Sequence, residues 1–357
     1  MRYIDKVLSE LNRYIPDGLY MGPKFTSRMM NGRSIKVYDI LITRKNVDNL
    51  PKASIFKMFN DKNFYIRLQG EKISVNVLEE DIMTHLVNKP ITVQSISLNV
   101  NNGSIDTDMI IDPLNVIPEI KEGYVGFNKE YTPKKDPQAL IKIVEYMALS
   151  KLKLNPKSRD DIKEHGYLIK TIESKRIKRI LFNILECKKS YFYFNYMDEE
   201  LDILNKIFPQ IDTMKNIGKC KYHVVDTWTH SINTMKEIEN IIYADGYFEN
   251  HLKRAYELHS NTLIGNYDRV KLLKLGALFH DIGKPKAQWV DSTGRNRFGG
   301  HETIGAEIVE EICKALEFSD AETSYLKKIV VNHMVTLILY KSNDVSGSSL
   351  FNVFEKL

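Results

Sequence analysis

The sequence predicts an α+β fold, with a mixed sheet in the N-terminal part and only helices in the rest of the chain. Three observations lead to this prediction. Short β-rich runs separated by turn-prone clusters fill the chain up to about residue 115. From residue 136 onward, apolar residues instead recur at helical spacing. The length of 357 residues is enough for two or three domains at roughly 100–200 residues each.

The N-terminal part is expected to contain six strands and, near its start, two helices. The helices are predicted over residues 2–14 and 25–30, and the consecutive carboxylates at 79–81 are interpreted as the solvated start of a further helix. The predicted strands are GLYM (18–21), KVYDILIT (36–43), NFYIRL (63–68), KISVNVL (72–78), ITVQSISLNV (91–100) and MIID (109–112).

A linker is predicted over residues 116–135, where Pro118, Gly123, Gly126 and Pro133 follow one another closely. A second change is expected near Gly218. We therefore expect three domains, at residues 1–135, 136–218 and 219–357.

The second and third domains are expected to be wholly helical. In residues 136–150, Leu140, Ile143, Val144 and Met147 lie on one helical face. Further helices are predicted over 158–172, 174–187, 222–242, 246–260, 267–281, 301–317 and 319–335.

Composition excludes several classes of protein. Hydrophobic residues make up 43% and charged residues 27%, which excludes a disordered or fibrous chain. No apolar run reaches the roughly 18 residues of a membrane-spanning helix, because the longest, 329–340, is interrupted by Asn332 and His333. The amphipathic N-terminus lacks the apolar core of a signal peptide.

Charge and cysteine content point to a soluble protein of a reducing cytoplasm. Three distant cysteines without a C-x-x-C pair argue against a disulfide framework or a zinc ribbon. The net charge of +5 permits an anionic partner such as RNA but does not require one.

Five of the nine histidines form one interpretable pattern near the ends or on one face of predicted helices, at His223, His230, His280, His301 and His333. His280 is followed by a carboxylate where Gly and Pro predict the end of a helix, so an imidazole and a carboxylate can enter one cavity. Together they suit Mg²⁺, Mn²⁺, Fe²⁺, Ni²⁺ or Zn²⁺. The alternative, histidines satisfied within helical cores, stays open on spacing alone.

Four segments resemble the HD-type metal phosphohydrolase domain, and more narrowly the version attached to bacterial tRNA nucleotidyltransferases (CCA-adding enzymes) and poly(A) polymerases. They are YHVVDTWTHS (222–231), LGALFHDIGKP (275–285), GRNRFGGHETIGAE (294–307) and VNHM (331–334). The resemblance implies that a divalent metal is bound by His230, His280 and Asp281.

The same resemblance implies further roles. His301 and His333 match histidines that hold a second metal, and Lys284 matches a lysine near the substrate phosphate, so Asp281 and Lys284 are the expected catalytic residues. His223 is expected to be structural. Asp344 is the only candidate for the domain's last aspartate ligand.

The N-terminal segments GRSIKVYDI (32–40), DPQALIKIVEYMA (136–148) and KRIKRILFNIL (175–185) resemble the polymerase-β-like head and the neck of the same family. Nucleotidyl transfer requires two carboxylates at x and x+2 of one strand. Here these positions are Val37 and Asp39, and the phosphate-cradling glycine pair is reduced to Gly22. In the neck, Glu145 stands where an arginine is expected. A head that keeps only a vestigial nucleotide site is therefore expected.

The resulting hypothesis is a metal-dependent phosphohydrolase acting on a nucleotide, a cyclic phosphate or an RNA 3′ end. Nucleotides or RNA, including tRNA, are the expected substrates, and no membrane is involved. Two alternatives remain: an active tRNA nucleotidyltransferase or poly(A) polymerase, and a non-catalytic RNA-binding or regulatory protein.

Overall fold

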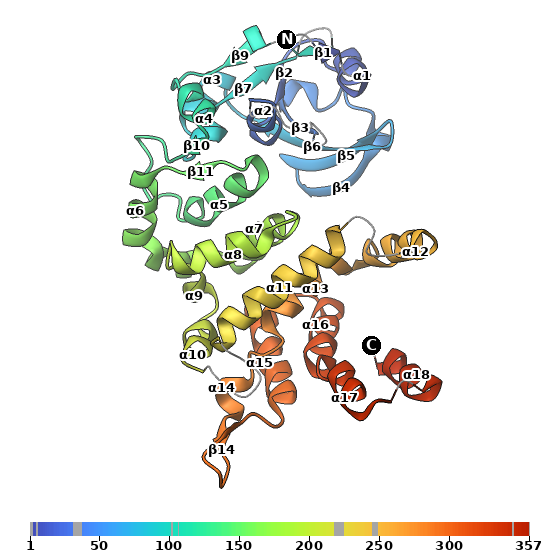
Figure 1. Cartoon of the computed structure of the whole chain (residues 1–357). Coiled ribbons are helices and arrows are strands. Elements are labelled where there is room, and N and C mark those ends of the chain that lie inside the picture. The colour runs from blue at the N-terminus through green and yellow to red at the C-terminus, as the bar shows by residue number, and fades with distance from the viewer. Residues whose placement is uncertain are drawn as a thin grey trace. The chain divides into compact units, whose positions relative to one another are not determined.

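A mixed seven-stranded sheet forms the centre of the first of two units into which the chain divides, Met1–His165 and Gly166–Leu357 (Figure 1). The computed structural model describes residues 3–4, 6–30, 38–100, 103–105, 107–217, 225–244, 249–344 and 346–356. The strands follow the order β4 (Ile55–Asn60), β5 (Asn63–Leu68), β6 (Glu71–Leu78), β3 (Tyr38–Thr43), β2 (Leu19–Met21), β7 (Ser97–Asn99) and β9 (Ile110–Ile111). β3 and β6 are parallel, and the other neighbours are antiparallel. The predicted mixed sheet is confirmed.

The core of this unit lies between the sheet and two helices, α1 (Lys6–Tyr14) and α2 (Pro23–Met30). Leu8 and Leu11 of α1 and Phe25 of α2 belong to one buried cluster with Ile40 and Ile42 of β3. Burying a side chain of this size contributes roughly 1.5–3 kcal/mol. The cluster therefore fixes the start of α2 against the central strand β3, where Asp39 lies.

Three details differ from the sequence prediction or sharpen it. Within the predicted strand 91–100, residues Thr92–Gln94 form a 3-10 turn and only Ser97–Asn99 are extended. The edge strand β4 was not predicted, and its pairing with β5 is irregular at two places. The predicted helix start at 79–81 is confirmed, because Asp81 caps α3 (Ile82–Val87) by accepting a hydrogen bond from the Thr84 N–H at 3.0 Å.

The predicted linker over 116–135 is wrong, because this segment is ordered and partly buried. It contains α4 (Ile117–Lys121) and β10 (Tyr124–Val125), and β10 pairs in parallel with β11 (Lys153–Leu154). Pro118 lies in the first turn of α4, where proline costs no backbone hydrogen bond. Gly123, with φ of +88°, makes the turn into β10. The turn residues therefore connect short elements rather than separate two domains. The division into three domains stays a prediction.

Helices dominate the remainder of the chain. The first unit ends with α5 (Ala139–Ser150) and α6 (Pro156–His165). The second unit contains α7 (Ser174–Leu185), α8 (Ser190–Glu199), α9 (Leu204–Ile207), α10 (Gln210–Asn216), α11 (Thr227–Tyr243), α12 (Asn250–Ser260), α13 (Arg269–Phe279), α14 (Lys284–Ala287), α15 (His301–Ala315), α16 (Asp320–Asn332), α17 (Val335–Ser342) and α18 (Gly347–Lys356). Two short strand pairs interrupt them, β12 (Leu263–Ile264) with β13 (Tyr267–Asp268) and β14 (Trp289–Val290) with β15 (Asn296–Arg297). The predicted α+β class is confirmed, but these strand pairs show that the C-terminal part is helical without being wholly helical as predicted.

A fully buried lysine joins the two helices that lie next to the predicted metal ligands His230 and His280. Lys274 of α13 donates hydrogen bonds to the carbonyl oxygens of Leu185 and Cys187, each at 2.8 Å, and lies 2.9 Å from a carboxylate oxygen of Glu239 on α11. The same Glu239 oxygen accepts a hydrogen bond from the backbone N–H of Ser190 at 3.0 Å. Because an unpaired buried charge is costly, this network sets how α11 and α13 align.

The apolar run at 329–340 forms two helices rather than one, since α16 ends at Asn332 and α17 begins at Val335. Nowhere in the described part of the chain is there a helix with the length and apolarity that crossing a bilayer requires.

Candidate metal centre

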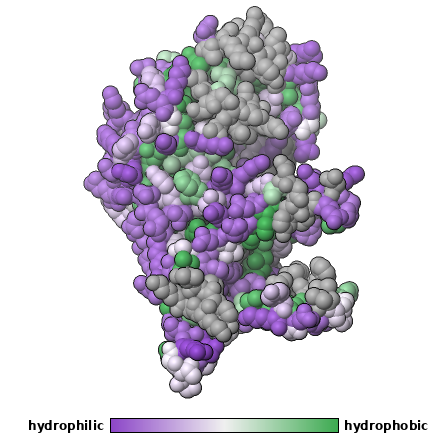
Figure 2. Space-filling view, in the orientation of Figure 1, coloured by the Kyte–Doolittle hydropathy of each residue, from purple (hydrophilic) through white to green (hydrophobic). Residues whose placement is uncertain are grey.

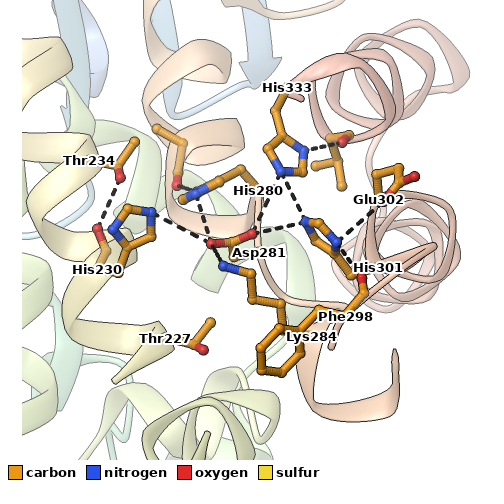
Figure 3. Close-up of polar contacts among 12 residues, drawn as sticks. Thr227, His230, Thr234, His280, Asp281, Lys284, Phe298, His301, Glu302 and His333 are labelled. Carbon is orange, nitrogen blue, oxygen red and sulfur yellow. Dashed lines mark hydrogen bonds and ion pairs between the residues drawn. The ribbon is translucent and has the colours of Figure 1, made fainter. Parts of the chain in front are cut away.

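Helix termini bring the sequence-predicted histidines together in the second unit (Figure 3). His230 lies in the first turns of α11, His280 directly follows α13, His301 is the first residue of α15, and His333 directly follows α16. Asp281 lies at the centre of this group.

The carboxylate of Asp281 faces two pairs of histidines through its two oxygens. Its Oδ2 lies 3.6 Å from the Nε2 of His230 and 3.1 Å from the Nε2 of His280. Its Oδ1 lies 3.2 Å from the Nε2 of His301 and 3.6 Å from the Nε2 of His333. Two groups of three candidate ligands therefore share one carboxylate, and within each group the ligand atoms lie within 4.8 Å of one another.

Backbone carbonyls fix the tautomer of three of these rings. The Nδ1 atoms of His280, His301 and His333 lie 2.7, 2.7 and 2.6 Å from the carbonyl oxygens of the residues three positions earlier. A carbonyl oxygen only accepts, so each Nδ1 carries the proton, and a neutral ring then has its lone pair on Nε2. These lone pairs are aimed at the Asp281 carboxylate.

This donor set fits a cation. The Nε2 atoms of His301 and His333 lie 3.2 Å apart, so two acceptor nitrogens of neutral rings face each other beside a carboxylate. His280, Asp281 and His301 are buried, with 8%, 2% and 6% of their surface exposed. Two buried imidazole acceptors that face each other without a donor between them are costly, and a divalent ion beside them would remove that cost.

Burial and hydrogen bonding act in opposite directions on the charges of this group. Burial alone would raise the pKa of Asp281, but the close rings of His280, His301 and His333 outweigh it and hold the pKa below its ordinary value. Burial would lower the pKa of His301, but the nearby Asp281 carboxylate raises it. Asp281 is therefore ionised, as a metal ligand must be.

Lys284 also belongs to this cluster. Its Nζ lies 2.6 Å from Oδ2 of Asp281 and 5.8 Å from the centroid of the Phe298 ring, and its side chain is buried. The lysine therefore places a positive charge beside the shared carboxylate.

Two features that sequence reasoning missed hold the helices in place. A Cβ atom on Gly283 would collide with the carbonyl oxygen of His301 and approach the Gly305 nitrogen at 2.5 Å, so only glycine lets α14 approach α15 this closely. Trp228, beside His230 in α11, is buried and donates a hydrogen bond from Nε1 to Asp198 of α8 at 2.7 Å. The glycine of the DIGKP segment was the available signal for the first feature.

Two sequence candidates lie elsewhere. Asp344 accepts hydrogen bonds from the Ser346 N–H at 3.1 Å and the Ser349 hydroxyl at 2.6 Å, and so organises the start of α18 instead of joining the cluster. His223 lies outside the described residues.

The vestigial nucleotide residues are brought together in the first unit. Asp39 on β3 accepts hydrogen bonds from the backbone N–H groups of Lys24 at 3.0 Å and Phe25 at 2.7 Å, at the start of α2. A Cβ atom on Gly22 would collide with this carboxylate, so glycine makes room for it. Val37 lies outside the described residues.

An ion pair closes the same region. Lys24 Nζ lies 2.8 Å from a carboxylate oxygen of Glu145 on α5, and the Glu145 side chain is 3% exposed. Burial raises the pKa of Asp39 to about 6 despite its hydrogen bonds. Both described groups of three candidate metal ligands, by contrast, lie in the second unit.

Comparisons with known proteins also assign a separate domain to the part of the chain that contains the candidate metal ligands. Residues 227–344 match the HD domain family. The chain is 22% identical over 250 residues to a bifunctional uridylyltransferase/uridylyl-removing enzyme of Pseudomonas putida (strain GB-1), covering 68% of this chain and 25% of that protein. It is 21% identical over 234 residues to the A-adding tRNA nucleotidyltransferase of Deinococcus radiodurans, covering 64% of this chain and 48% of that protein. The chain thus matches less than half the length of either relative.

Solved structures share the fold over 98% of the chain. A tRNA-processing enzyme matches with a TM-score of 0.62 at 10% identity, over 84% of its own chain. The Thermotoga maritima CCA-adding enzyme complexed with tRNA matches with a TM-score of 0.52 at 14% identity, over 77% of its own chain. The chain therefore has an HD domain in its C-terminal part and the overall fold of these nucleotidyltransferase-like proteins.

Proposed function

We propose that the chain is a metal-dependent phosphohydrolase whose HD domain cleaves a phosphate ester of a nucleotide, a cyclic phosphate or an RNA 3′ end. The observation that carries this proposal is the buried Asp281 carboxylate, whose two oxygens face two pairs of histidine nitrogens. A pair of divalent ions held there would supply Lewis acidity toward a phosphoryl oxygen and offset its charge.

The residues of the cluster have separate parts in this proposal. His230 and His280 would complete one ligand set, and His301 and His333 the other, with Asp281 shared between them. Lys284 is charged and close enough to Asp281 to attract a phosphate to the same place. Four imidazoles and one carboxylate favour Fe²⁺, Ni²⁺, Zn²⁺ or Mn²⁺ over Mg²⁺, which prefers oxygen ligands.

We propose no transfer activity for the head. Asp39 is occupied in capping α2, and Lys24 is paired with Glu145, so the charged groups of this region already satisfy one another. The alternative of an active nucleotidyltransferase rests on the shared fold and on the name of the Deinococcus radiodurans relative.

A hydrolase screen tests the proposal. Purified protein would be given p-nitrophenyl phosphate, bis-p-nitrophenyl phosphate, 2′,3′-cyclic nucleotides and 3′-phosphorylated RNA, each with Mn²⁺, Ni²⁺, Zn²⁺ or Mg²⁺. We expect hydrolysis that is absent from Asp281→Ala and retained by His251→Ala, a matched change at a histidine whose side chain is 70% exposed on α12. Equal turnover by the wild type and Asp281→Ala would show that hydrolysis does not depend on this site, and no turnover with any substrate and metal would leave the non-catalytic RNA-binding alternative.

A further inference from the structure

A β-hairpin connects Lys284 to His301, two residues of the candidate metal centre. It comprises β14 and β15, with Trp289 opposite Arg297 and Val290 opposite Asn296, and it forms the projecting element at the foot of Figure 1. Lys284 lies five residues before Trp289, and His301 lies four residues after Arg297. Because a chain spans at most about 3.6 Å per residue, the Cα of Trp289 lies within about 18 Å of that of Lys284.

Polar contacts, rather than an apolar core, hold this hairpin in shape. Asp291 accepts hydrogen bonds from the backbone N–H groups of Thr293 at 2.8 Å and Arg295 at 3.1 Å, and its other oxygen lies 2.7 Å from Nε of Arg297. Gly294, with φ of +76°, completes the turn. These contacts hold the hairpin in shape without any contribution from its largest side chain.

That side chain is Trp289, which is 56% exposed. Directly opposite residues of a strand pair lie on the same face, so Trp289 and Arg297 share one face of the hairpin. The surrounding exposed side chains are mostly polar, as the purple and pale surface at the foot of Figure 2 shows. A large exposed aromatic ring on an ordered, polar hairpin has no packing role there and is available for a ligand.

The charge of the hairpin indicates that this ligand is an anion. Lys286, Arg295 and Arg297 are exposed, and Asp291 is the only carboxylate between Lys284 and His301. Asp291 is already engaged by Arg297, so the remaining basic groups are available to an anion. An aromatic platform flanked by basic side chains is the arrangement that binds single-stranded nucleic acid, by base stacking and phosphate contacts.

We infer that the β14–β15 hairpin binds a single-stranded oligonucleotide leading to the metal cluster, with Trp289 stacked on a base and Arg295 and Lys286 against phosphates. The inference rests on the proposed function and narrows its substrate class from small esters to oligonucleotides. The hairpin lies several residues along the chain from the candidate metal centre. The base stacked on Trp289 therefore belongs to a different nucleotide from the one whose phosphate is cleaved.

Tryptophan fluorescence tests the inference without turnover. The chain has two tryptophans, and Trp228 is buried, so an oligonucleotide stacking on the protein should quench mainly Trp289. Titration of a short oligo(U) or oligo(A) RNA, and of the matching DNA, into Asp281→Ala protein should quench this emission. Trp289→Ala should weaken binding by roughly tenfold, followed with a labelled oligonucleotide. Trp289→Phe should restore most of it, and Val290→Ala, on the opposite face, should leave binding unchanged.

Two further readouts separate this inference from the proposed function. Arg295→Ala should reduce the salt dependence of binding, because a phosphate contact releases counterions. In the hydrolase assay, Trp289→Ala should raise KM for an oligonucleotide several-fold more than KM for p-nitrophenyl phosphate. Quenching without hydrolysis of any ester would overturn the proposed function and support the hairpin site. Hydrolysis of small esters with no quenching, or with Trp289→Ala binding as the wild type does, would overturn the hairpin site alone.

Discussion

Asp281 is the residue on which both candidate ligand sets depend. Replacing it with Asn keeps the size of the side chain but removes the charge that both sets share. We expect Asp281→Asn to lose bound metal and to lower hydrolysis by at least about a hundredfold, since even changes to groups behind a ligand cost roughly 10–100-fold. Metal analysis and the hydrolase assay measure this, with His251→Ala as the control. Wild-type metal content in Asp281→Asn would contradict the assignment.

His280 and His301 belong to different ligand sets, so they allow the two sets to be counted separately. We expect His280→Ala and His301→Ala each to lose one ion per chain and to retain the other. Elemental analysis of carefully loaded protein is the measurement. If metal disappears only in His280→Ala and is unaffected by both His301→Ala and His333→Ala, the chain holds a single ion.

Asp39 should make folding of the first unit depend on pH. Burial raises its pKa from 3.8 to about 6, so between these values the folded state holds the proton more tightly than the unfolded state. Its contribution to stability is full below pH 3.8, declines as pH rises, and is lost above about pH 6.

Asp39→Asn removes this titration. The free energy of unfolding of the wild type relative to Asp39→Asn should therefore fall between pH 4 and 6, by up to about 3 kcal/mol. Urea unfolding at a series of pH values, followed by a signal from the first unit, measures it. Parallel pH profiles for the two proteins would show that the carboxylate has an ordinary pKa.

At the scale of elements, the close approach of α14 to α15 is what places His301 beside Asp281. Gly283 permits it, because any side chain there meets the backbone of α15. We expect Gly283→Ala to force the helices apart, to weaken metal binding by the His301 and His333 set, and to destabilise the second unit by roughly 1–3 kcal/mol. Metal content and thermal unfolding report the two effects.

Gly299→Ala is the matched control for this change, since a Cβ atom there meets nothing within 4 Å. Equal behaviour of the two alanine variants would show that α15 is positioned by other contacts.

Local patterns predicted most elements, and they failed where tertiary contacts decide. The stripes at 174–187, 301–317 and 319–335 correspond to α7, α15 and α16, because each helix buries one continuous apolar face. Helix α8 was not predicted, because its own apolar and aromatic side chains point in several directions and do not form a single apolar face. The strand β10 forms by pairing with the distant β11, which a window of sequence does not contain, whereas the edge strand β4 pairs irregularly with its neighbour β5.

The cluster itself was predictable because its residues occur in short motifs, whereas their supports were not. His280 and Asp281 are adjacent in sequence, and His230 and His301 lie near helix starts that Asp226 and Gly300 indicate. Asp344 was a wrong candidate for a ligand, because only the fold shows that its carboxylate is used by Ser346 and Ser349. Gly22, expected to cradle a phosphate, instead makes room for Asp39.

For the whole molecule, the two units are proposed to differ in chemistry although both resemble enzymes in fold. We expect no incorporation of labelled ATP or CTP into tRNA or oligo(A) by the purified chain, because Asp39 and Lys24 are both engaged within the first unit. A gel-based incorporation assay, with an active CCA-adding enzyme as the positive control, measures this. Incorporation that disappears in Asp39→Ala would show that the head is an active transferase.

The histidines and Asp281 come from the termini of four helices that are spread over residues 230–333. Two ions held by the two ligand sets and joined through Asp281 would act as a cross-link between segments that are distant along the chain, and the unfolded chain offers no comparable site. Binding of this kind stabilises the folded state by RT ln(1 + [L]/Kd) for each ion, so stability rises with the concentration of free metal. The folded fraction of the second unit would then depend on metal supply, and a chelator would act on this protein as a denaturant as well as an inhibitor of the proposed activity.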